Sequence, residues 1–135
     1  MGVLTSIIDK SISGNFESDV FKVGGYAFRN CRNLTSVSFP NATSIGQNAF
    51  SSCSSLTSAS IPNATSIGTY AFDSCSNLTT IYVGTNTSTV CTLSNTNAFD
   101  SCYDLTIIYV PASLVDSYKS STNWSSYADK IKAAP

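Results

Sequence analysis

Residues 49–58 read AFSSCSSLTS, and this stretch decides the fold because it recurs at a fixed interval. Related copies start at Ala27 and Ala71, so the phenylalanines that follow are 22 residues apart. A fourth copy starts at Ala98 after a step of 27 residues, which predicts an insertion of about five residues. A repeat of this length is typical of stacked supersecondary units that cannot bury their apolar faces alone.

A short β-strand is predicted after each copy. Residues 34–40 read LTSVSFP, in which apolar and polar side chains alternate. Such alternation with β-branched residues favours a strand. The closing proline ends the strand because proline has no N–H to give to a sheet. With one such strand in every repeat, the strands are expected to stack into a parallel sheet.

The other two sides of each repeat are predicted to be a corner and a tight helical turn. Residues 41–46 read NATSIG and recur at 63–68, and asparagine with glycine favours a corner. Ile45 and Ile67 are expected to point inward from this side. Four columns of side chains are then expected to fill the interior: Phe28/Phe50/Phe72/Phe99, Cys31/Cys53/Cys75/Cys102, Leu34/Leu56/Leu78/Leu105 and Val37/Ala59/Ile81/Ile108.

These strings resemble the BspA-like leucine-rich repeats, a bacterial family. The resemblance covers roughly residues 20–135 and rests on the pattern AFxxCxxLTSVxFPNATSIGxxAF. It implies a right-handed leucine-rich-repeat solenoid of the β/α type that binds a partner, often at a cell or virion surface. The tail at residues 109–125 also resembles the C-terminal end of such proteins from gut bacteria and their phages. The chain departs from the pattern at Gly84, where a proline is expected, and in an insertion near residues 85–96.

The chain is predicted to form a single repeat domain over residues 1–135. Residues 1–24 are expected to hold an N-terminal cap and a degenerate repeat. Residues 25–111 are expected to hold about four repeats with the insertion, and residues 112–135 a helical C-terminal cap. This division follows from the stretch over which the repeat pattern is recognisable.

Both ends of the solenoid need a cover, because a terminal repeat has no neighbour on its outer side. Helices are predicted over residues 112–120 and 125–133, where apolar residues recur at helical spacing. Those apolar residues are Leu114, Val115, Tyr118, Trp124, Tyr127 and Ile131. The N-terminal cover is expected from Ile7, Ile8, Ile12 and Phe16. Because it is the weaker one by sequence, a weak homo-oligomer through the N-terminal edge is also expected.

The overall composition argues against nucleic-acid binding and against insertion into a membrane. The 135 residues are 42% hydrophobic and only 11% charged, with a net charge of −1, whereas binding a phosphate backbone requires a basic surface. No stretch is long and apolar enough to cross a bilayer. No signal peptide is seen, so a cytoplasmic location stays open beside the cell or virion surface that the resemblance implies.

Five cysteines raise the alternatives of free thiols, disulfides and a metal site. Four of them hold one position of the repeat, where neighbouring strands lie about 4.8 Å apart, within reach of a disulfide. Side chains in a column point the same way, however, and no CxxC pair is present. Buried free thiols are therefore favoured over disulfides and metal ligands. Cys91, in the insertion, is the cysteine expected to be exposed.

Catalysis is not supported by the sequence. The chain has no histidine, which is the commonest general base and metal ligand. The carboxylates are scattered, and a glycine loop of the kind that cradles phosphate is missing. No enzymatic activity, cofactor or metal ion is therefore expected.

The outward face of the predicted strands carries the candidate binding site. One outward column reads Ser36, Ser58, Thr80, Ile107, and the other reads Ser38, Ser60, Tyr82, Tyr109. The face thus changes from small and polar to aromatic and apolar toward the C-terminus. Tyrosine offers a large contact area at low entropic cost, so the candidate site residues are Thr80, Tyr82, Ile107 and Tyr109. The alternative is that these aromatics simply suit a strand or pack against the C-terminal cap.

Two functions follow from these observations. The first is a non-enzymatic binding or adhesion module of a bacterial or phage surface protein, which recognises a host protein or a glycan through the strand face. The second is an intracellular regulatory or inhibitory protein-binding factor encoded by a mobile element. The uncharged surface and the resemblance favour the first, whereas the column of reduced cysteines and the missing signal sequence favour the second.

Overall fold

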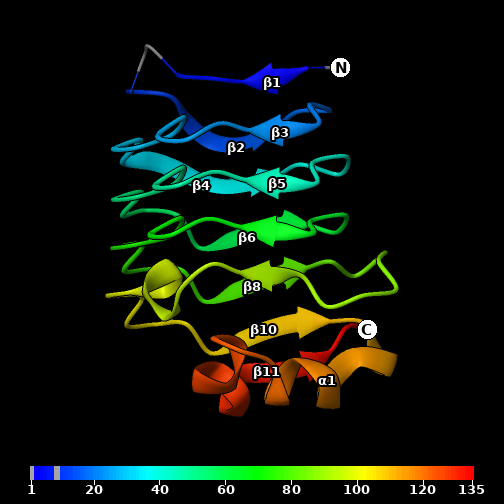
Figure 1. Ribbon diagram of the computed structural model, residues 1–135. Helices are drawn as coiled ribbons and strands as arrows, with labels where there is room; N and C mark the ends of the chain where they lie inside the picture. Colours follow the sequence, from blue (N-terminus) through cyan, green and yellow to red (C-terminus); the bar gives the residue numbers. More distant parts are fainter. Residues whose placement is uncertain (1, 8–9) are drawn as a thin grey trace.

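The chain folds into a solenoid whose turns carry two parallel sheets (Figure 1). The structure is a computed structural model that describes residues 2–7 and 10–135. The six-stranded sheet consists of β2 (Ser13–Glu17), β4 (Asn33–Ser38), β6 (Ser58–Ile61), β8 (Thr80–Val83), β10 (Ile107–Val110) and β11 (Ile131–Ala133). The five-stranded sheet consists of β1 (Val3–Leu4), β3 (Lys22–Val23), β5 (Ser44–Ile45), β7 (Ser66–Ile67) and β9 (Thr92–Leu93).

The predicted solenoid of parallel strands is confirmed, but each repeat forms two strands rather than one. The corner residues of β5 pair in parallel with those of β3 and β7. The corner backbone becomes extended because its N–H and C=O groups need partners, and the matching groups of the neighbouring turns supply them.

The third side of each repeat is a string of tight turns rather than a continuous helix. The N–H groups of Ala49 and Ser51 each donate to the carbonyl three residues earlier. Those of Phe50 and Ser52 instead donate to the next turn of the solenoid, at 2.7 and 2.8 Å. This alternation uses left-handed residues such as Asn48 (φ 56°) and Ser52 (φ 61°), and these keep a regular helix from forming.

The insertion predicted near residues 85–96 is divided between two places. Strand β8 still pairs with β6 in the 22-residue register. Ile67 of β7 pairs with Leu93 of β9, 26 residues further on, so four extra residues lie between β8 and β9. The fifth lies in the next segment, where the chain forms the 3-10 helix η1 (Thr96–Phe99).

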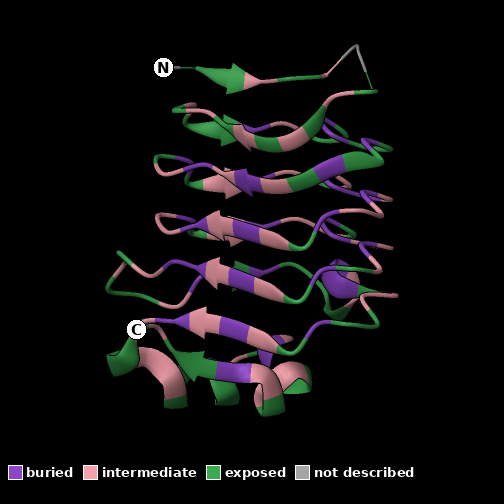
Figure 2. Ribbon diagram, turned by 180° about the vertical axis from the view of Figure 1, so that it is seen from behind, coloured by how far each residue is buried: buried purple, intermediate pink, exposed green. Residues whose placement is uncertain are grey.

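The interior is filled by columns of stacked side chains, as predicted. Along the phenylalanine column, successive ring centroids lie 5.1, 5.1 and 5.5 Å apart. The four predicted columns are buried throughout, except that Cys102 is half-buried. Figure 2 shows buried residues alternating with less buried ones along the strands. Two further buried columns join them: Phe39/Ile61/Val83/Val110 and Val23/Ile45/Ile67/Leu93.

Glycine is required where two turns of the solenoid approach closely. A Cβ atom on Gly46 would lie 2.5 Å from the backbone nitrogen of Gly25, and one on Gly68 would lie 2.6 Å from that of Gln47. Any side chain at these corners would push neighbouring turns apart. The corner therefore needs glycine for close approach rather than for a positive φ.

The C-terminal end is closed by short helices and a last strand (Figure 1). The helices are η2 (Ala112–Leu114), α1 (Val115–Ser120) and η3 (Trp124–Lys130). The helix predicted over residues 125–133 is wrong in its last part, because Ile131–Ala133 form β11 and pair with β10. The free edge of β10 needs hydrogen-bond partners, and this requirement overrides the local helical spacing.

The N-terminal end presents β1 and β2 as the outermost strands of the two sheets. Phe16 packs on Phe28, with ring centroids 5.0 Å apart. Ile7 and Ile12 are half-buried against the core, and Ile8 lies outside the described residues. The homo-oligomer predicted for this edge stays a prediction.

Candidate binding face

The four candidate residues lie together on the outward side of the six-stranded sheet, here called the strand face. Thr80 pairs with Ile107, and Tyr82 pairs with Tyr109, in the register of β8 and β10. All four are half-buried, whereas Ile81, which lies between two of them, is fully buried. Because side chains alternate along a strand, the four point to solvent side by side, in the two columns that the sequence predicts.

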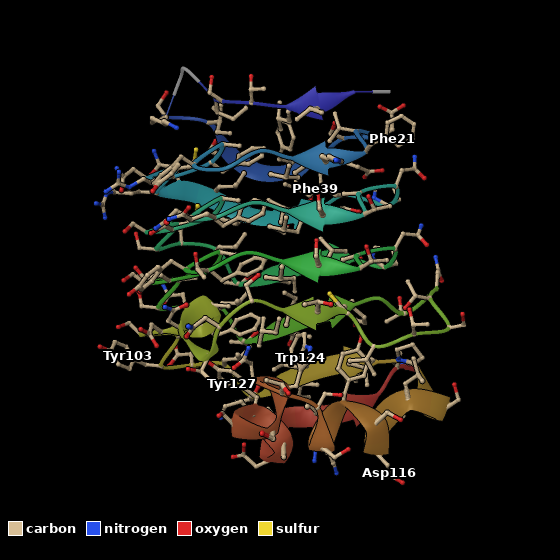
Figure 3. All side chains as sticks on the ribbon, in the orientation of Figure 1. Phe21, Phe39, Tyr103, Asp116, Trp124 and Tyr127 are labelled. Atoms are coloured by element: carbon tan, nitrogen blue, oxygen red, sulfur yellow. The ribbon has the colours of Figure 1, made fainter. Side chains whose placement is uncertain are left out.

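Tyr82 and Tyr109 form a stacked aromatic pair. Their ring centroids lie 4.8 Å apart with 28° between the planes. Such a pair adds roughly 0.5–1.5 kcal/mol beyond its area burial. The aromatic rings of the cap make other contacts: Trp124 and Tyr127, labelled in Figure 3, pack on Phe99, and Tyr118 packs on Trp124. Ring packing against the cap therefore does not explain the tyrosine pair.

Both outward columns extend further than the sequence predicted. At one end, β2 places Asn15 and Glu17 opposite Ser36 and Ser38. At the other end, β11 places Lys132 opposite Tyr109. Lys132 was missed because its segment was predicted to be helical, and an alternation over three residues is too short a signal to indicate a strand.

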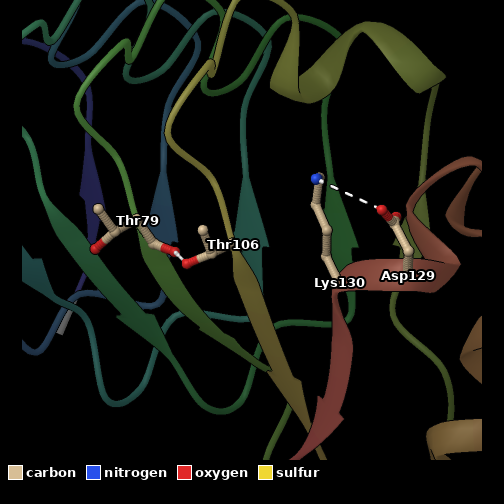
Figure 4. Close-up of polar contacts among 4 residues, drawn as sticks. All are labelled: Thr79, Thr106, Asp129 and Lys130. Atoms are coloured by element: carbon tan, nitrogen blue, oxygen red, sulfur yellow. Dashed lines mark hydrogen bonds and ion pairs between the residues drawn. The ribbon is translucent and has the colours of Figure 1, made fainter.

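A column of threonines at the start of the strands is structural. The hydroxyls of Thr57, Thr79 and Thr106 each donate to the carbonyl of the threonine one turn earlier, at 3.1 Å. Figure 4 shows this contact between Thr106 and Thr79. These hydroxyls connect neighbouring turns by hydrogen bonds, so the threonine column is not part of the candidate site on the strand face.

At the β9 edge of the five-stranded sheet, side chains rather than another strand form hydrogen bonds with the backbone. The N–H of Cys91 donates to Tyr118 Oη at 2.9 Å, and Trp124 Nε1 donates to the carbonyl of Cys91 at 2.6 Å. Asn123 Nδ2 donates to the carbonyl of Leu93 at 2.7 Å. The edge next to β9 is thus satisfied by the cap, which removes a template for strand pairing.

A cavity of about 440 Å³ lies beside the five-stranded sheet, between β9 and residues 121–124. Its exposed lining includes the hydroxyls of Thr92, Ser94 and Thr122. None of its lining residues is charged. Its one titratable group is the thiol of Cys91, which is buried and whose pKa burial raises to about 12.

All five cysteines are free thiols. The Sγ atoms of Cys53, Cys75 and Cys102 each donate to the carbonyl of the phenylalanine 25 or 30 residues earlier, at 3.0–3.1 Å. The prediction that Cys91 is exposed is wrong, because it is fully buried under the cap. The insertion has no matching repeat, so nothing in the sequence indicated on which side Cys91 lies.

Three of the thiols, Cys75, Cys91 and Cys102, are hard to ionise, whereas a hydrogen bond with Cys75 lowers the pKa of Cys53. Burial raises the pKa of Cys91 and of Cys102 to about 12. A hydrogen bond with Cys53, together with burial, raises the pKa of Cys75 well above 9. Since the thiolate is the nucleophile and the metal ligand, Cys75, Cys91 and Cys102 are suited to packing rather than to chemistry.

Stability is expected to fall as the pH rises above about 9. The unfolded chain releases its thiol protons near pH 9, whereas folded Cys91 and Cys102 hold theirs up to about 12. The contribution of these two thiols to the free energy of unfolding is therefore complete below a pH of about 9. It is lost progressively between a pH of about 9 and a pH of about 12. Urea unfolding at a series of pH values checks this, with the double variant Cys91→Ala/Cys102→Ala as control. An equally steep fall in that variant would show that other groups cause it.

Residues 2–7 and 10–135 form neither a metal centre nor a membrane-spanning helix. No group of three or more His, Cys, Asp and Glu side chains in that part is placed to hold a metal ion. Its helices all lack the length and apolar composition that crossing a bilayer demands.

Comparisons with known proteins agree with this architecture. The family model described as BspA type leucine rich repeat region matches residues 9–127, in six copies. The leucine-rich repeat protein of T. pallidum, TpLRR, aligns with a TM-score of 0.60 and 24% identity over 82% of this chain. A leucine-rich cell surface protein of Faecalibacterium prausnitzii A2-165 aligns with a TM-score of 0.52 and 21% identity over 90% of this chain.

The chain spans only part of these two proteins, 64% of the first and 36% of the second. At such identities the likeness shows a shared fold. No curated protein sequence matches the chain.

Proposed function

The chain belongs to the BspA-type leucine-rich repeat family, and on that premise we propose that it is a non-enzymatic binding and adhesion module of a bacterial or phage surface protein. It recognises a host protein or a glycan through the part of the strand face formed by Thr80, Tyr82, Ile107 and Tyr109. The stacked tyrosine pair, outward-facing and half-buried, carries the proposal. The description of the F. prausnitzii relative as a cell surface protein supports the location.

Thr80, Tyr82, Ile107 and Tyr109 occupy outward positions at which the side chain differs from one repeat to the next. Ser58 and Ser60 of β6 pair with Thr80 and Tyr82 of β8, and one strand later the same columns carry Ile107 and Tyr109. Inward positions stay apolar because burial of apolar area stabilises the fold. Outward positions are free of that constraint, so large side chains there are available to a ligand.

The strand face is also rigid. Strand β8 is paired on both sides, with β6 and β10, and β10 is paired on both sides, with β8 and β11. A ligand that binds a preorganised surface loses less affinity to the ordering of side chains and loops. Aromatic side chains on such a support are the usual anchors of an interface.

The double variant Tyr82→Ser/Tyr109→Ser is expected to lose binding. Removing two anchor rings weakens an interface by about 2 kcal/mol or more, roughly 30-fold in affinity. The measurement is the dissociation constant of each ligand that the immobilised chain selects from a glycan array, from host-cell surface proteins or from a whole-cell lysate. The melting temperature is expected to fall by only a few degrees.

Tyr26→Ser/Tyr70→Ser is the matched control. These tyrosines are 47% and 40% exposed and lie on the turn side of the solenoid. The control is expected to bind as the wild type does. Equal losses in the two double variants, or none in either, would refute the strand face as the site. If the selected ligand is an intracellular enzyme, the function is regulation rather than adhesion. The strand face would still be the binding site.

A further inference from the structure

The charge around the tyrosine pair is one-sided. Lys132 is exposed and lies opposite Tyr109 across the β10–β11 register, on the same face of the sheet because Ile131 beside it is buried. Glu17, at the other end of this column, lies four strands from Tyr109, which is roughly 19 Å at the usual strand spacing. At that distance salt screens its charge, so Lys132 is the charge of this column that lies next to the tyrosine pair.

Lys132 is free to meet a ligand. Lys130, just before β11, forms a loose ion pair with Asp129, with Nζ and Oδ2 3.9 Å apart (Figure 4). Its charge is therefore largely offset by its neighbour. Lys132 forms no ion pair with any residue that the structure describes. The positive charge next to the rings thus lacks a protein counter-ion.

The rest of the face is a layer of hydroxyls. Ser36, Ser38, Ser58, Ser60 and Thr80 lead up to the tyrosine pair, and all are half-buried. Small hydroxyl side chains form hydrogen bonds in either direction and add little apolar surface to the face. Such a surface suits a ligand that is itself rich in hydroxyl groups.

A peptide fits the face less well. Peptides that bind as an extra strand need an exposed sheet edge. Both β8 and β10 already have partners on each side, and the cap helices α1 and η2 contact β11, the last strand at this end of the sheet. Peptides that bind as a helix need a hydrophobic groove, whereas Ile107 is the one aliphatic side chain among the outward residues of β4, β6, β8 and β10. A sugar ring instead places its C–H face on a tyrosine ring and its hydroxyls on serines and threonines.

From these observations we propose that the ligand of the strand face is an acidic glycan. A sugar ring packs on the face of Tyr109 that Tyr82 does not cover, on the side of Lys132, and a carboxylate or sulfate on that ring or the next one is held by Lys132. This inference rests on the proposed function, because it takes the strand face as the binding site. It adds the chemical class of the ligand and assigns Lys132 as a residue that determines specificity.

The test uses the full chain and immobilised glycans in charged and uncharged pairs. The probes are polygalacturonate beside galactan, and sialylated and sulfated lactosamine beside lactosamine, with poly-glutamate as the acidic peptide. At least one acidic glycan is expected to bind about tenfold more tightly than its uncharged partner. Binding is expected to weaken as salt rises from about 50 to about 300 mM. The sialylated and sulfated arms distinguish a carboxylate from a sulfate.

Variants of single lysines isolate the charge contact. Lys132→Ala is expected to weaken binding of the acidic glycan about fivefold and to leave the uncharged partner unaffected. Lys22→Ala is the control, because Lys22 lies in β3 of the other sheet. Equal effects of the two substitutions, equal binding of charged and uncharged glycans, or binding of poly-glutamate alone would each overturn the acidic-glycan proposal.

The two proposals fail in different ways. If no acidic glycan binds but Tyr82→Ser/Tyr109→Ser abolishes capture of a host protein, the strand face stands and the acidic-glycan inference is wrong. If an acidic glycan binds and the tyrosine variant retains full affinity, the strand face itself is wrong, and the glycan inference falls with it.

Discussion

Replacing Phe50 by alanine is expected to lower the free energy of unfolding by about 3–5 kcal/mol. The ring is fully buried and stacks between Phe28 and Phe72, with centroids 5.1 Å away on both sides. The space left behind cannot collapse readily, because hydrogen bonds hold the adjacent turns at a fixed strand spacing. Since the free energy of unfolding of a whole domain is only about 5–15 kcal/mol, urea unfolding should show that a large part of it is lost.

Phe21→Ala is the control for this substitution. The same side chain is removed, but Phe21 is 47% exposed, so the expected loss is about 1 kcal/mol or less. Similar losses at the two positions would mean that the buried phenylalanine column does not dominate the stability of the solenoid.

Replacing Trp124 by alanine is expected to open the C-terminal end. The side chain is 1% exposed, packs on Phe99 and Tyr118, and donates a hydrogen bond to the buried carbonyl of Cys91. Loss of the ring costs about 3–5 kcal/mol. Urea unfolding gives the free energy. The rate at which a thiol reagent labels Cys91 is expected to rise, because the ring covers that residue.

Trp124→Phe separates packing from hydrogen bonding. It keeps much of the ring but removes the N–H donor, which leaves the carbonyl of Cys91 unpaired at a cost of about 1–3 kcal/mol. Tyr103→Ala is the control, because Tyr103 is 82% exposed and its loss should be small. Unchanged labelling of Cys91 in Trp124→Ala would contradict the role of this side chain as a cover.

The fold could be predicted from the sequence wherever the same position recurs in several repeats. The 22-residue period fixes which residues stack, so it predicts the column of Phe28, Phe50 and Phe72 that the structure shows. The same register places Tyr82 beside Tyr109, although the insertion makes them 27 residues apart. Strand positions survive the insertion because its extra residues lie after Val83, beyond the end of the strand.

The features that the sequence did not reveal depend on contacts without a repeat to copy. Trp124, Tyr127 and Ile131 are spaced as a helix face, yet Ile131 joins β10 because a sheet edge needs partners. Cys91 lies in the insertion, which has no equivalent in the other repeats. The repeat pattern therefore could not indicate its burial under Tyr118 and Trp124. The place of Lys132 on the strand face depends on the same last strand.

The most direct test of the strand face is a nuclear magnetic resonance titration of the isotope-labelled chain with the ligand that it binds most tightly. Backbone amide shifts are expected to concentrate at residues 80–82 and 107–109, with a smaller set at Lys132. The turn side around Tyr26 and Tyr70 should stay unchanged. Shifts centred on that side, or on the cavity beside β9, with none in β8 and β10, would contradict the account.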